Sequence, residues 1–278
     1  MRPASHAENE ALRRMYVQES MVTPEIAARL GCGVSTVLRR LRALGIARRP
    51  RGPRPASWHS GSDQRVVWSP DMAWVVGLIA TDGNLANGRH GISITSKDLE
   101  LLKSARRCLG LTNRLVRVRG GWGTRGHRLQ WRGRTVYAWL LTIGLMPRKS
   151  LTLGPLAVPD EVFADFFRGC IDGDGTVLVY TDRHHTRRKA SYVYTRLYVS
   201  LVSASRPFLD WIRATIHRLV GLPGRVHAKK APMGRTIWCL RYSKRASLRL
   251  LGWMYYSPTV PCLARKRAKA EPFILSPE

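Results

Sequence analysis

Two apolar segments, residues 74–83 and residues 166–175, repeat the same pattern of side chains at one constant offset. The pattern predicts a helix in each segment, and small residues recur every four positions in both, including Gly77 in the first and Gly169 and Gly173 in the second. A glycine inside a helix costs roughly 1 kcal/mol relative to alanine, so a compensating contact is needed. Small residues at this spacing let two helices approach backbone to backbone. We therefore expect the two helices to pack directly on each other.

Each of these helices is expected to end on an acidic residue. Asp82 and Asp174 occupy equivalent positions of the repeat, and the glycines that follow them, Gly83 and Gly175, can adopt the left-handed conformation of a helix terminus. A carboxylate is disfavoured at this end of a helix because the helix dipole is negative there. Two such carboxylates on paired helices would be stabilised by divalent cations, which prefer oxygen ligands.

The periodicity of the remaining apolar positions predicts the same series of elements twice. The first series comprises a strand at 91–96, a helix at 97–109, hairpin strands at 113–119 and 127–132 around a glycine-rich turn at 120–123, and a helix at 134–145. The second comprises strands at 176–180 and 191–203, a helix at 207–220, hairpin strands at 225–230 and 236–242, and a helix at 244–254. We therefore predict an α+β fold of two pseudosymmetric halves, residues 66–158 and 159–278, each of the form αββαββα.

Residues 1–47 predict a small all-α domain that resembles bacterial helix-turn-helix modules. The apolar positions expected in its core are Leu12, Tyr16, Val17, Ile26, Leu30, Val34, Val37, Leu38 and Leu41. Thr23 is expected to cap the second helix, and residues 31–33 form the turn. The third helix then presents residue types that contact bases and phosphates in a major groove, namely Ser35, Thr36, Arg39 and Arg40. A helical hairpin that serves only packing or dimerisation is the alternative.

Residues 48–65 separate this domain from the repeat. Arginine and proline alternate within the segment, which excludes a helix and predicts an extended, basic linker. Such an arm can lie in a minor groove of DNA, and a solvated tether is the competing interpretation.

The amino-acid composition indicates which kind of molecule the protein binds. The formal net charge is +29 at pH 7 and the isoelectric point is near 11.3, which predicts a polyanionic partner. The five cysteines show no paired spacing, so we expect a reducing compartment and no zinc site. We find no signal peptide and no apolar run long enough to span a membrane, and we expect a cytoplasmic, nucleoid-associated protein.

Basic and polar residues on the predicted strands are candidates for contact with DNA. In the first half they are Arg114, Arg117, Arg119, Arg128, Gln130 and Arg132, expected on one face of the sheet. In the second half they are Arg183, Arg187, Arg188 and Lys189 in a loop, Tyr194 and Arg196 on one strand face with Tyr192 and Tyr198, and Lys229 and Arg235 in the last hairpin. An antiparallel sheet can present such a face to a major groove while its other face packs on helices.

The two repeated segments resemble the paired motifs of LAGLIDADG homing endonucleases in their single-chain form. Residues 75–83 and 167–175 fill the two motifs, and the final acid of each motif is retained as Asp82 and Asp174. The resemblance covers residues 66–270. This sequence departs from the family pattern at Ala80, Thr81, Arg168 and Cys170, and Ala80 stands where the family carries an acid that is mainly structural.

The resemblance implies a catalytic site. Asp82 and Asp174, with the backbone carbonyls of Thr81 and Gly173, would hold two or three Mg²⁺ ions, for which Mn²⁺ can substitute. The family carries a lysine before the second motif, which corresponds to Lys149, and Lys266 is its counterpart in the C-terminal stretch. A simple basic tail is the other interpretation of that stretch. Either lysine would stabilise charge on the scissile phosphate or order the attacking water.

These observations predict a monomeric, site-specific DNA endonuclease that makes a double-strand break at a long, imperfectly palindromic target. The family implies that such enzymes spread their own introns or inteins, and the helix-turn-helix domain would extend the footprint on DNA. A non-cleaving LAGLIDADG-like transcription regulator is the leading alternative, because the first motif has drifted at Ala80 and Thr81. An intron RNA maturase would share the basic surface and is a third interpretation.

Overall fold

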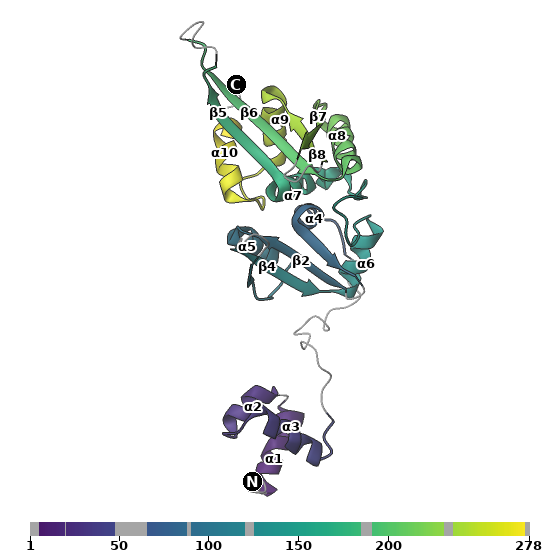
Figure 1. Cartoon of the computed structure of the whole chain (residues 1–278), viewed down its shortest axis with the longest axis vertical. Helices are drawn as coiled ribbons and strands as arrows, with labels where there is room; N and C mark the ends of the chain where they lie inside the picture. The colour runs from purple at the N-terminus through teal and green to yellow at the C-terminus, as the bar shows by residue number, and fades with distance from the viewer. Residues whose placement is uncertain are drawn as a thin grey trace. The chain divides into compact units, whose positions relative to one another are not determined.

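The structure is a computed structural model that describes residues 6–19, 21–47, 66–87, 90–119, 125–184, 191–230 and 236–275 (Figure 1). The chain forms two compact units, residues 1–62 and residues 63–278. Among the described helices, none combines the length and the apolar character that crossing a bilayer requires.

The larger unit consists of two halves with the same topology. The first half contains α4 (Pro70–Asp82), β1 (Gly83–Ala86), β2 (Gly91–Ser96), α5 (Leu99–Cys108), β3 (Val116–Arg119), β4 (Arg125–Arg132) and α6 (Arg134–Thr142). The second contains α7 (Phe163–Asp174), β5 (Gly175–Asp182), β6 (Tyr194–Ser203), α8 (Arg206–Val220), β7 (Arg225–Lys230), β8 (Thr236–Tyr242), α9 (Lys244–Met254) and α10 (Ala264–Leu275), and a short 3-10 turn at Asp160–Val162 precedes α7. The predicted α+β fold with two equivalent halves is therefore confirmed.

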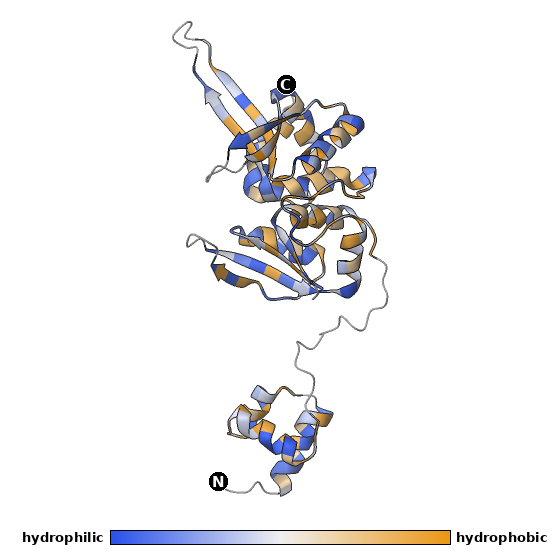
Figure 2. Ribbon diagram, turned by 45° about the vertical axis from the view of Figure 1, so that its right-hand side comes forward, coloured by the Kyte–Doolittle hydropathy of each residue, from blue (hydrophilic) through white to orange (hydrophobic). Residues whose placement is uncertain are grey.

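Each half is built on a four-stranded antiparallel sheet with equivalent strand order. The order is β1-β2-β4-β3 in the first half and β5-β6-β8-β7 in the second. Hydrophilic and hydrophobic residues alternate along several strands, as the ribbon colours in Figure 2 show, and successive side chains of a strand point to opposite faces of its sheet. Helices α5 and α4 contact the inner face of the first sheet, and α8, α9 and α10 contact the second sheet. Figure 1 shows α4 and α7 next to each other where the two halves meet.

Several predicted element bounds are confirmed, including those of β2. Strands β7 and β8 and helix α9 have the bounds expected from the sequence. Helix α6 ends at Thr142, earlier than expected, because Gly144 takes a φ of +99° that a helix cannot contain. The stretch interpreted as a possible basic tail is a helix, α10, which contains Pro272.

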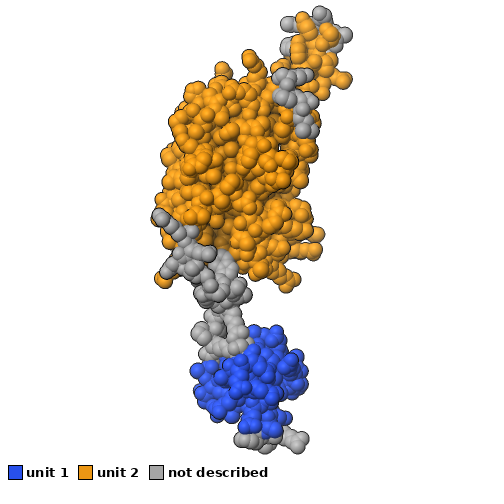
Figure 3. Space-filling view, turned by 180° about the vertical axis from the view of Figure 1, so that it is seen from behind, with its two compact units in different colours: residues 1–62 blue, residues 63–278 orange. Residues whose placement is uncertain are grey.

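The smaller unit is helical, and Figure 3 shows it in blue. It contains α1 (His6–Arg13), a π-helical turn at Arg14–Gln18, α2 (Thr23–Arg29) and α3 (Val34–Ala43). Its core is formed by buried side chains, of which Leu12, Met15, Tyr16, Ile26, Ala27, Val37 and Leu41 are the members. Gly31 adopts the left-handed φ of +62° that the predicted turn between α2 and α3 requires.

Three details of the smaller unit differ from expectation. Val17 is 56% exposed, because the π-helical turn has more residues per turn than an α-helix and shifts Val17 off the apolar stripe. Val34 is 39% exposed, since it is the first residue of α3 and precedes the turn that packs. Thr23 is the first residue of α2, and the cap position belongs to Val22, which provides no side-chain hydrogen bond.

Candidate active site and nucleic-acid interface

Helices α4 and α7 meet through their glycines. A Cβ atom added to Gly77 would collide with the carbonyl oxygen of Phe166 and lie 2.9 Å from the Cα of Gly169. A Cβ atom added to Gly169 would likewise collide with the carbonyl oxygen of Trp74. The two helix backbones are thus in direct contact, and any larger residue at either glycine would separate them. This close packing explains why both helices tolerate the cost of an interior glycine.

Both helices end on their aspartates, as expected, but the glycines that follow are extended. Gly83 has φ −87° and ψ 159°, and Gly175 has φ −89° and ψ 170°, so the expected left-handed conformation is wrong. Glycine is needed here for space. An added Cβ would lie 2.7 Å from the carbonyl oxygen of Ile79 at Gly83, and 2.7 Å from that of Ile171 at Gly175. Each chain turns sharply against the last helical turn and enters the first strand of its sheet.

The helix pairing brings the two aspartates, distant in sequence, into one site. A carboxylate oxygen of Asp82, Oδ2, lies 3.3 Å from the position of a Cβ added to Gly173, directly before Asp174. Burial and the negative charge of Asp174 raise the pKa of Asp82 to about 6. Asp82 is half-buried, whereas Asp174 reaches solvent, yet the surrounding protein displaces enough water to raise the pKa of Asp174 as well.

Two buried lysines, each 5% exposed, accompany the aspartates. The Nζ atom of Lys149 donates a hydrogen bond to the carbonyl oxygen of Gly83, just after the first motif. The Nζ atom of Lys266 donates to the carbonyl oxygens of Ile171, Asp172 and Gly173 at 2.6, 2.9 and 3.1 Å. Burial lowers the pKa of both ammonium groups, and the two site aspartates oppose this shift. The structure therefore places all four predicted catalytic residues together.

The donor set at this site fits a hard divalent cation. Two carboxylates, on Asp82 and Asp174, lie together and the charge of Asp174 raises the pKa of Asp82, a penalty that a bound cation would remove. The predicted further donors are the carbonyls of Thr81 and Gly173, and the latter already accepts one hydrogen bond from Lys266. Among the described residues, no group of three or more histidine, cysteine, aspartate or glutamate side chains could hold a metal ion. Backbone oxygen and water would therefore complete the coordination.

Two residues of the second motif depart from the LAGLIDADG pattern, Arg168 and Cys170, and both are buried. Arg168 is fully buried and forms an ion pair with Asp165. Its guanidinium also donates to the carbonyl oxygens of Met254 at 2.6 Å and Pro261 at 2.8 Å. Cys170 is buried in the helix contact, where its backbone nitrogen would lie 2.8 Å from a Cβ on Gly77.

The remaining departures lie in the first motif. Thr81 bonds through its hydroxyl to the carbonyl oxygens of Gly77 and Leu78, which satisfies it within α4. Ala80 is buried, 6% exposed, where the second motif carries Asp172.

Asp172 was not singled out from the sequence, yet it is central to the second motif. Its Oδ2 atom accepts hydrogen bonds from the indole of Trp74 at 2.9 Å and from the backbone of Leu263 at 3.0 Å. Its Oδ1 atom is buried with no partner among the described residues. Burial raises the pKa of Asp172 to about 6. The equivalence of Asp172 with Ala80 in the repeat was the available signal.

The expectation of a single basic face on the first sheet is wrong. The register pairs Thr95 with Arg128 and Ser93 with Gln130, so Arg128, Gln130 and Arg132 share the outer face. Arg117 is opposite His127, which places Arg117 and Arg119 on the other face, where both are exposed. The pairing register of β3 with β4 decides the face of each side chain, because a shift of one residue would exchange the two faces of β3. Arg114 is exposed and precedes β3.

The outer face of the second sheet is aromatic and basic. Tyr194, Arg196 and Tyr198 share one face of β6, as predicted, and the register adds Tyr180, Arg225, His227, Lys229 and Arg241. The Arg241 guanidinium carbon lies 3.7 Å from the ring centroid of Tyr198, which stacks on Tyr180 at 6.4 Å. Arg196 is paired with Asp182 at 2.9 Å. Arg225, His227 and Arg241 were missed because cross-strand register is needed to place them.

The residues of the smaller unit that are predicted to contact DNA lie on α3. Ser35 and Arg39 are exposed and Thr36 is half-exposed. Arg40 turns toward α1 and pairs with Glu8 at 3.4 Å, so its guanidinium is engaged within the unit. Several other predictions lie outside the described residues, namely the linker at 48–65, the turn at 120–123, Arg187, Arg188, Lys189 and Arg235. Arg183 is described and is exposed.

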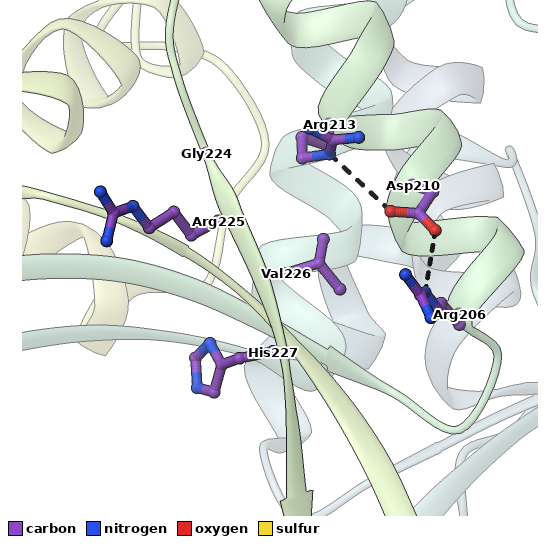
Figure 4. Close-up of a pocket in the computed structure, with 7 residues that line it drawn as sticks. All are labelled: Arg206, Asp210, Arg213, Gly224, Arg225, Val226 and His227. Atoms are coloured by element: carbon purple, nitrogen blue, oxygen red, sulfur yellow. Dashed lines mark hydrogen bonds and ion pairs between the residues drawn. The ribbon is translucent and has the colours of Figure 1, made fainter.

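A shallow pocket between α8 and β7 is separate from the motif site. Figure 4 shows Arg206 and Arg213 flanking Asp210, with Val226 pointing toward the helix and Arg225 and His227 pointing from the opposite side of the strand. Asp210 forms ion pairs at 3.3 Å with Arg206 and at 3.8 Å with Arg213. The pocket holds no acid or lysine of the paired motifs.

Comparison with known proteins agrees with this architecture. Residues 69–144 match the family described as LAGLIDADG-like domain. The homing endonuclease I-WcaI bound to its DNA recognition sequence is 11% identical, with a TM-score of 0.51 over 79% of this chain and 94% of that chain. The LAGLIDADG meganuclease I-AabMI bound to uncleaved DNA is 15% identical, with a TM-score of 0.50 over 74% of this chain and 89% of that chain.

A weaker likeness extends to full-length DUF199/WhiA from Thermatoga maritima, 11% identical with a TM-score of 0.46 over 76% of this chain and 62% of that chain. No curated protein sequence matches the chain. The expected family resemblance is thus confirmed, with a LAGLIDADG-like domain in the first half and the two-half LAGLIDADG fold across the larger unit.

Proposed function

We propose that this chain, which carries the LAGLIDADG fold, is a site-specific DNA endonuclease that cuts both strands by metal-dependent hydrolysis. The observation that carries the proposal is the convergence of Asp82, Asp174 and Lys149 at the base of two helices in backbone contact. A scaffold alone does not require two mutually repelling carboxylates at the negative ends of paired helices. Perturbed acids beside buried lysines are typical of catalytic sites.

Asp82 and Asp174, with the carbonyls of Thr81 and Gly173, would hold Mg²⁺ or Mn²⁺. Bound there, the cation would lower the pKa of a water molecule and neutralise charge on the phosphate oxygens. Lys149 is anchored through one hydrogen bond to the Gly83 carbonyl, and its ammonium has two further donors with no partner among the described residues. These donors can stabilise charge that develops on the scissile phosphate.

Duplex DNA is the substrate that the surface favours. Both sheets carry basic outer faces, and the net charge of +29 supports strong attraction to phosphates. Two halves of equivalent topology suit a long, imperfectly palindromic target. Helix α3 of the smaller unit would enlarge the footprint, and the chain would act as a monomer because it supplies both halves itself. Mobility of an intron or intein is the biological role that such cleavage would serve.

Selection from a randomised duplex library, with and without Mg²⁺, tests the proposal. The parent protein should release library ends only with Mg²⁺, and sequencing of those ends should define one target. Asp82→Asn and Asp174→Asn should each slow cleavage at least about 100-fold, because a lost metal ligand removes several kcal/mol of charge stabilisation. Asp160→Asn is the matched control, since Asp160 is a surface acid paired with Arg218.

The outcomes separate the candidate functions. Target-selective binding without metal-dependent cutting would reject the nuclease and favour a non-cleaving DNA-binding regulator. Equal cleavage by the parent and by both motif variants would show that the activity arises elsewhere. Preference for structured RNA over duplex DNA would favour a maturase.

A further inference from the structure

The two lysines at the site are held in different ways. A lysine ammonium has three hydrogen-bond donors. Lys266 directs its ammonium to three successive carbonyls at the end of α7, those of Ile171, Asp172 and Gly173. These are carbonyls of the last helical turn, where the supply of partners within the helix ends. That of Ile171 also accepts a hydrogen bond from the backbone nitrogen of Gly175, whereas Lys266 is the partner of those of Asp172 and Gly173. Lys266 thus acts as a cap of α7, whereas Lys149 uses a single donor, to Gly83.

The helix that carries Lys266 is seated by two further contacts. The backbone nitrogen of Leu263, one residue before α10, donates to the buried carboxylate of Asp172 at 3.0 Å. Arg265 forms a bidentate ion pair with Asp98 in the first half, at 2.9 and 3.1 Å. The first turn of α10 is therefore attached both to the second motif and to the loop that follows β2.

We infer that Lys266 is a positioning residue, which holds the last turn of α7 and thereby the carboxylate of Asp174, while Lys149 alone offers free donors to the reacting phosphate. The inference deepens the proposed function and rests on it for the identity of the reaction. Its geometric basis is independent of that function, because the three hydrogen bonds fix the helix end from which Asp174 projects. A hydrogen bond that fixes the position of a ligand residue governs how tightly that residue holds its metal.

A lysine near the metal site can affect Mn²⁺ affinity through its positive charge or by positioning a ligand. Loss of the lysine changes the affinity in opposite directions in these two cases. Removal of a nearby cation should strengthen the binding of Mn²⁺ through reduced repulsion. Removal of a residue that positions a ligand should weaken binding, by roughly 10- to 100-fold. Lys266→Met should therefore weaken Mn²⁺ binding despite the loss of a positive charge. Lys149→Met, which leaves α7 capped, should leave the affinity unchanged or tighten it.

Electron paramagnetic resonance of free Mn²⁺, titrated into the full-length protein without DNA, measures these affinities. Lys266→Arg should restore most of the affinity, because a guanidinium keeps both the charge and several donors. Lys269→Met, an exposed lysine on the same helix, should bind Mn²⁺ as the parent does. Thermal unfolding followed by circular dichroism confirms that every variant is folded at the temperature of titration.

Cleavage of the selected target separates the roles further. At saturating Mn²⁺, Lys266→Met should recover most of the parent rate, while Lys149→Met should stay slow at every Mn²⁺ concentration. Unchanged or tighter Mn²⁺ binding in Lys266→Met would overturn the inference, as would a cleavage defect that saturating metal does not relieve. A parent protein that binds Mn²⁺ but cuts no DNA would reject the nuclease proposal, and the Mn²⁺ affinities would still decide the role of Lys266.

Discussion

The two motif helices occupy equivalent places in the fold, yet they differ in what they bury. Where α4 has Ala73, Val76 and Ala80, the repeat places Asp165, Arg168 and Asp172 on α7. All six residues are buried. In α4 the buried positions add to an apolar core, whereas in α7 they form a polar network inside the protein.

The difference follows from the chain that comes after α9. Arg168 donates to the carbonyls of Met254 and Pro261, and Asp172 accepts from the backbone of Leu263. These partners belong to the segment that leads from α9 into α10. Buried backbone groups of an irregular segment need hydrogen-bond partners, and α7 supplies them. Two equivalent helices can thus diverge in chemistry because only one of them must hold a C-terminal extension.

Conversion of the α7 pattern into the α4 pattern should produce the largest effect. Arg168→Val alone should lower the free energy of unfolding by roughly 3–5 kcal/mol, because it removes the ion-pair partner of the buried Asp165. Asp165→Ala with Arg168→Val, which reproduces the residues of α4, should recover part of this loss. Urea denaturation of both single variants and the double variant measures the coupling. A double variant that loses as much unfolding free energy as the two single variants together would show that the ion pair does not explain the difference between α4 and α7.

The outer faces of the two sheets should differ in how they recognise DNA. Arg241 is held over Tyr198 in the second sheet, so we expect it to contact one base, and Arg241→Ala should cost about 1–3 kcal/mol of discrimination there. Lys229→Ala, on the same face, should weaken binding to all sequences and reduce the salt dependence by about one phosphate contact. Binding to single-base variants of the selected target, at several salt concentrations, distinguishes the two. Uniform weakening by Arg241→Ala would assign that arginine to the backbone of the DNA.

The smallest expected effect is on the titration of the two motif acids. Asp82 and Asp174 should titrate as a coupled pair. In metal-free protein, Asp82 should titrate near its raised pKa of about 6, above its ordinary value of 3.8. Asp174→Asn should lower the pKa of Asp82, since it removes the repelling charge. Carboxyl carbon NMR measures both titrations, and an unchanged Asp82 pKa would show that the two acids do not interact.

The same pKa shift fixes the sign of the stability change. Between pH 4 and pH 6 the folded protein binds more protons at Asp82 than the unfolded chain does. This contribution to stability is therefore fully present below the unfolded pKa and is lost as the pH rises through about 6. Asp82→Asn should accordingly raise the melting temperature of metal-free protein at pH 7, and Asp160→Asn, at the surface, should not.

The sequence by itself determined the repeat and the elements built on it. Equivalent spacing of Gly77 and Gly169 predicted that two helices meet, because glycine inside a helix is costly unless backbones touch. Alternation of apolar residues predicted most strands and helices of both halves, including β7, β8 and α9 with their observed bounds. These are local properties, which depend on residues that are neighbours in the chain.

Only the tertiary structure decided what depends on register and on distant partners. The faces of Arg117 and Arg128 followed from the pairing register of β3 with β4. The role of Asp172 and the three hydrogen bonds of Lys266 arise where α7 meets the first turn of α10. Such contacts join residues far apart in the chain, so no local pattern encodes them, and they distinguish the second motif from the first.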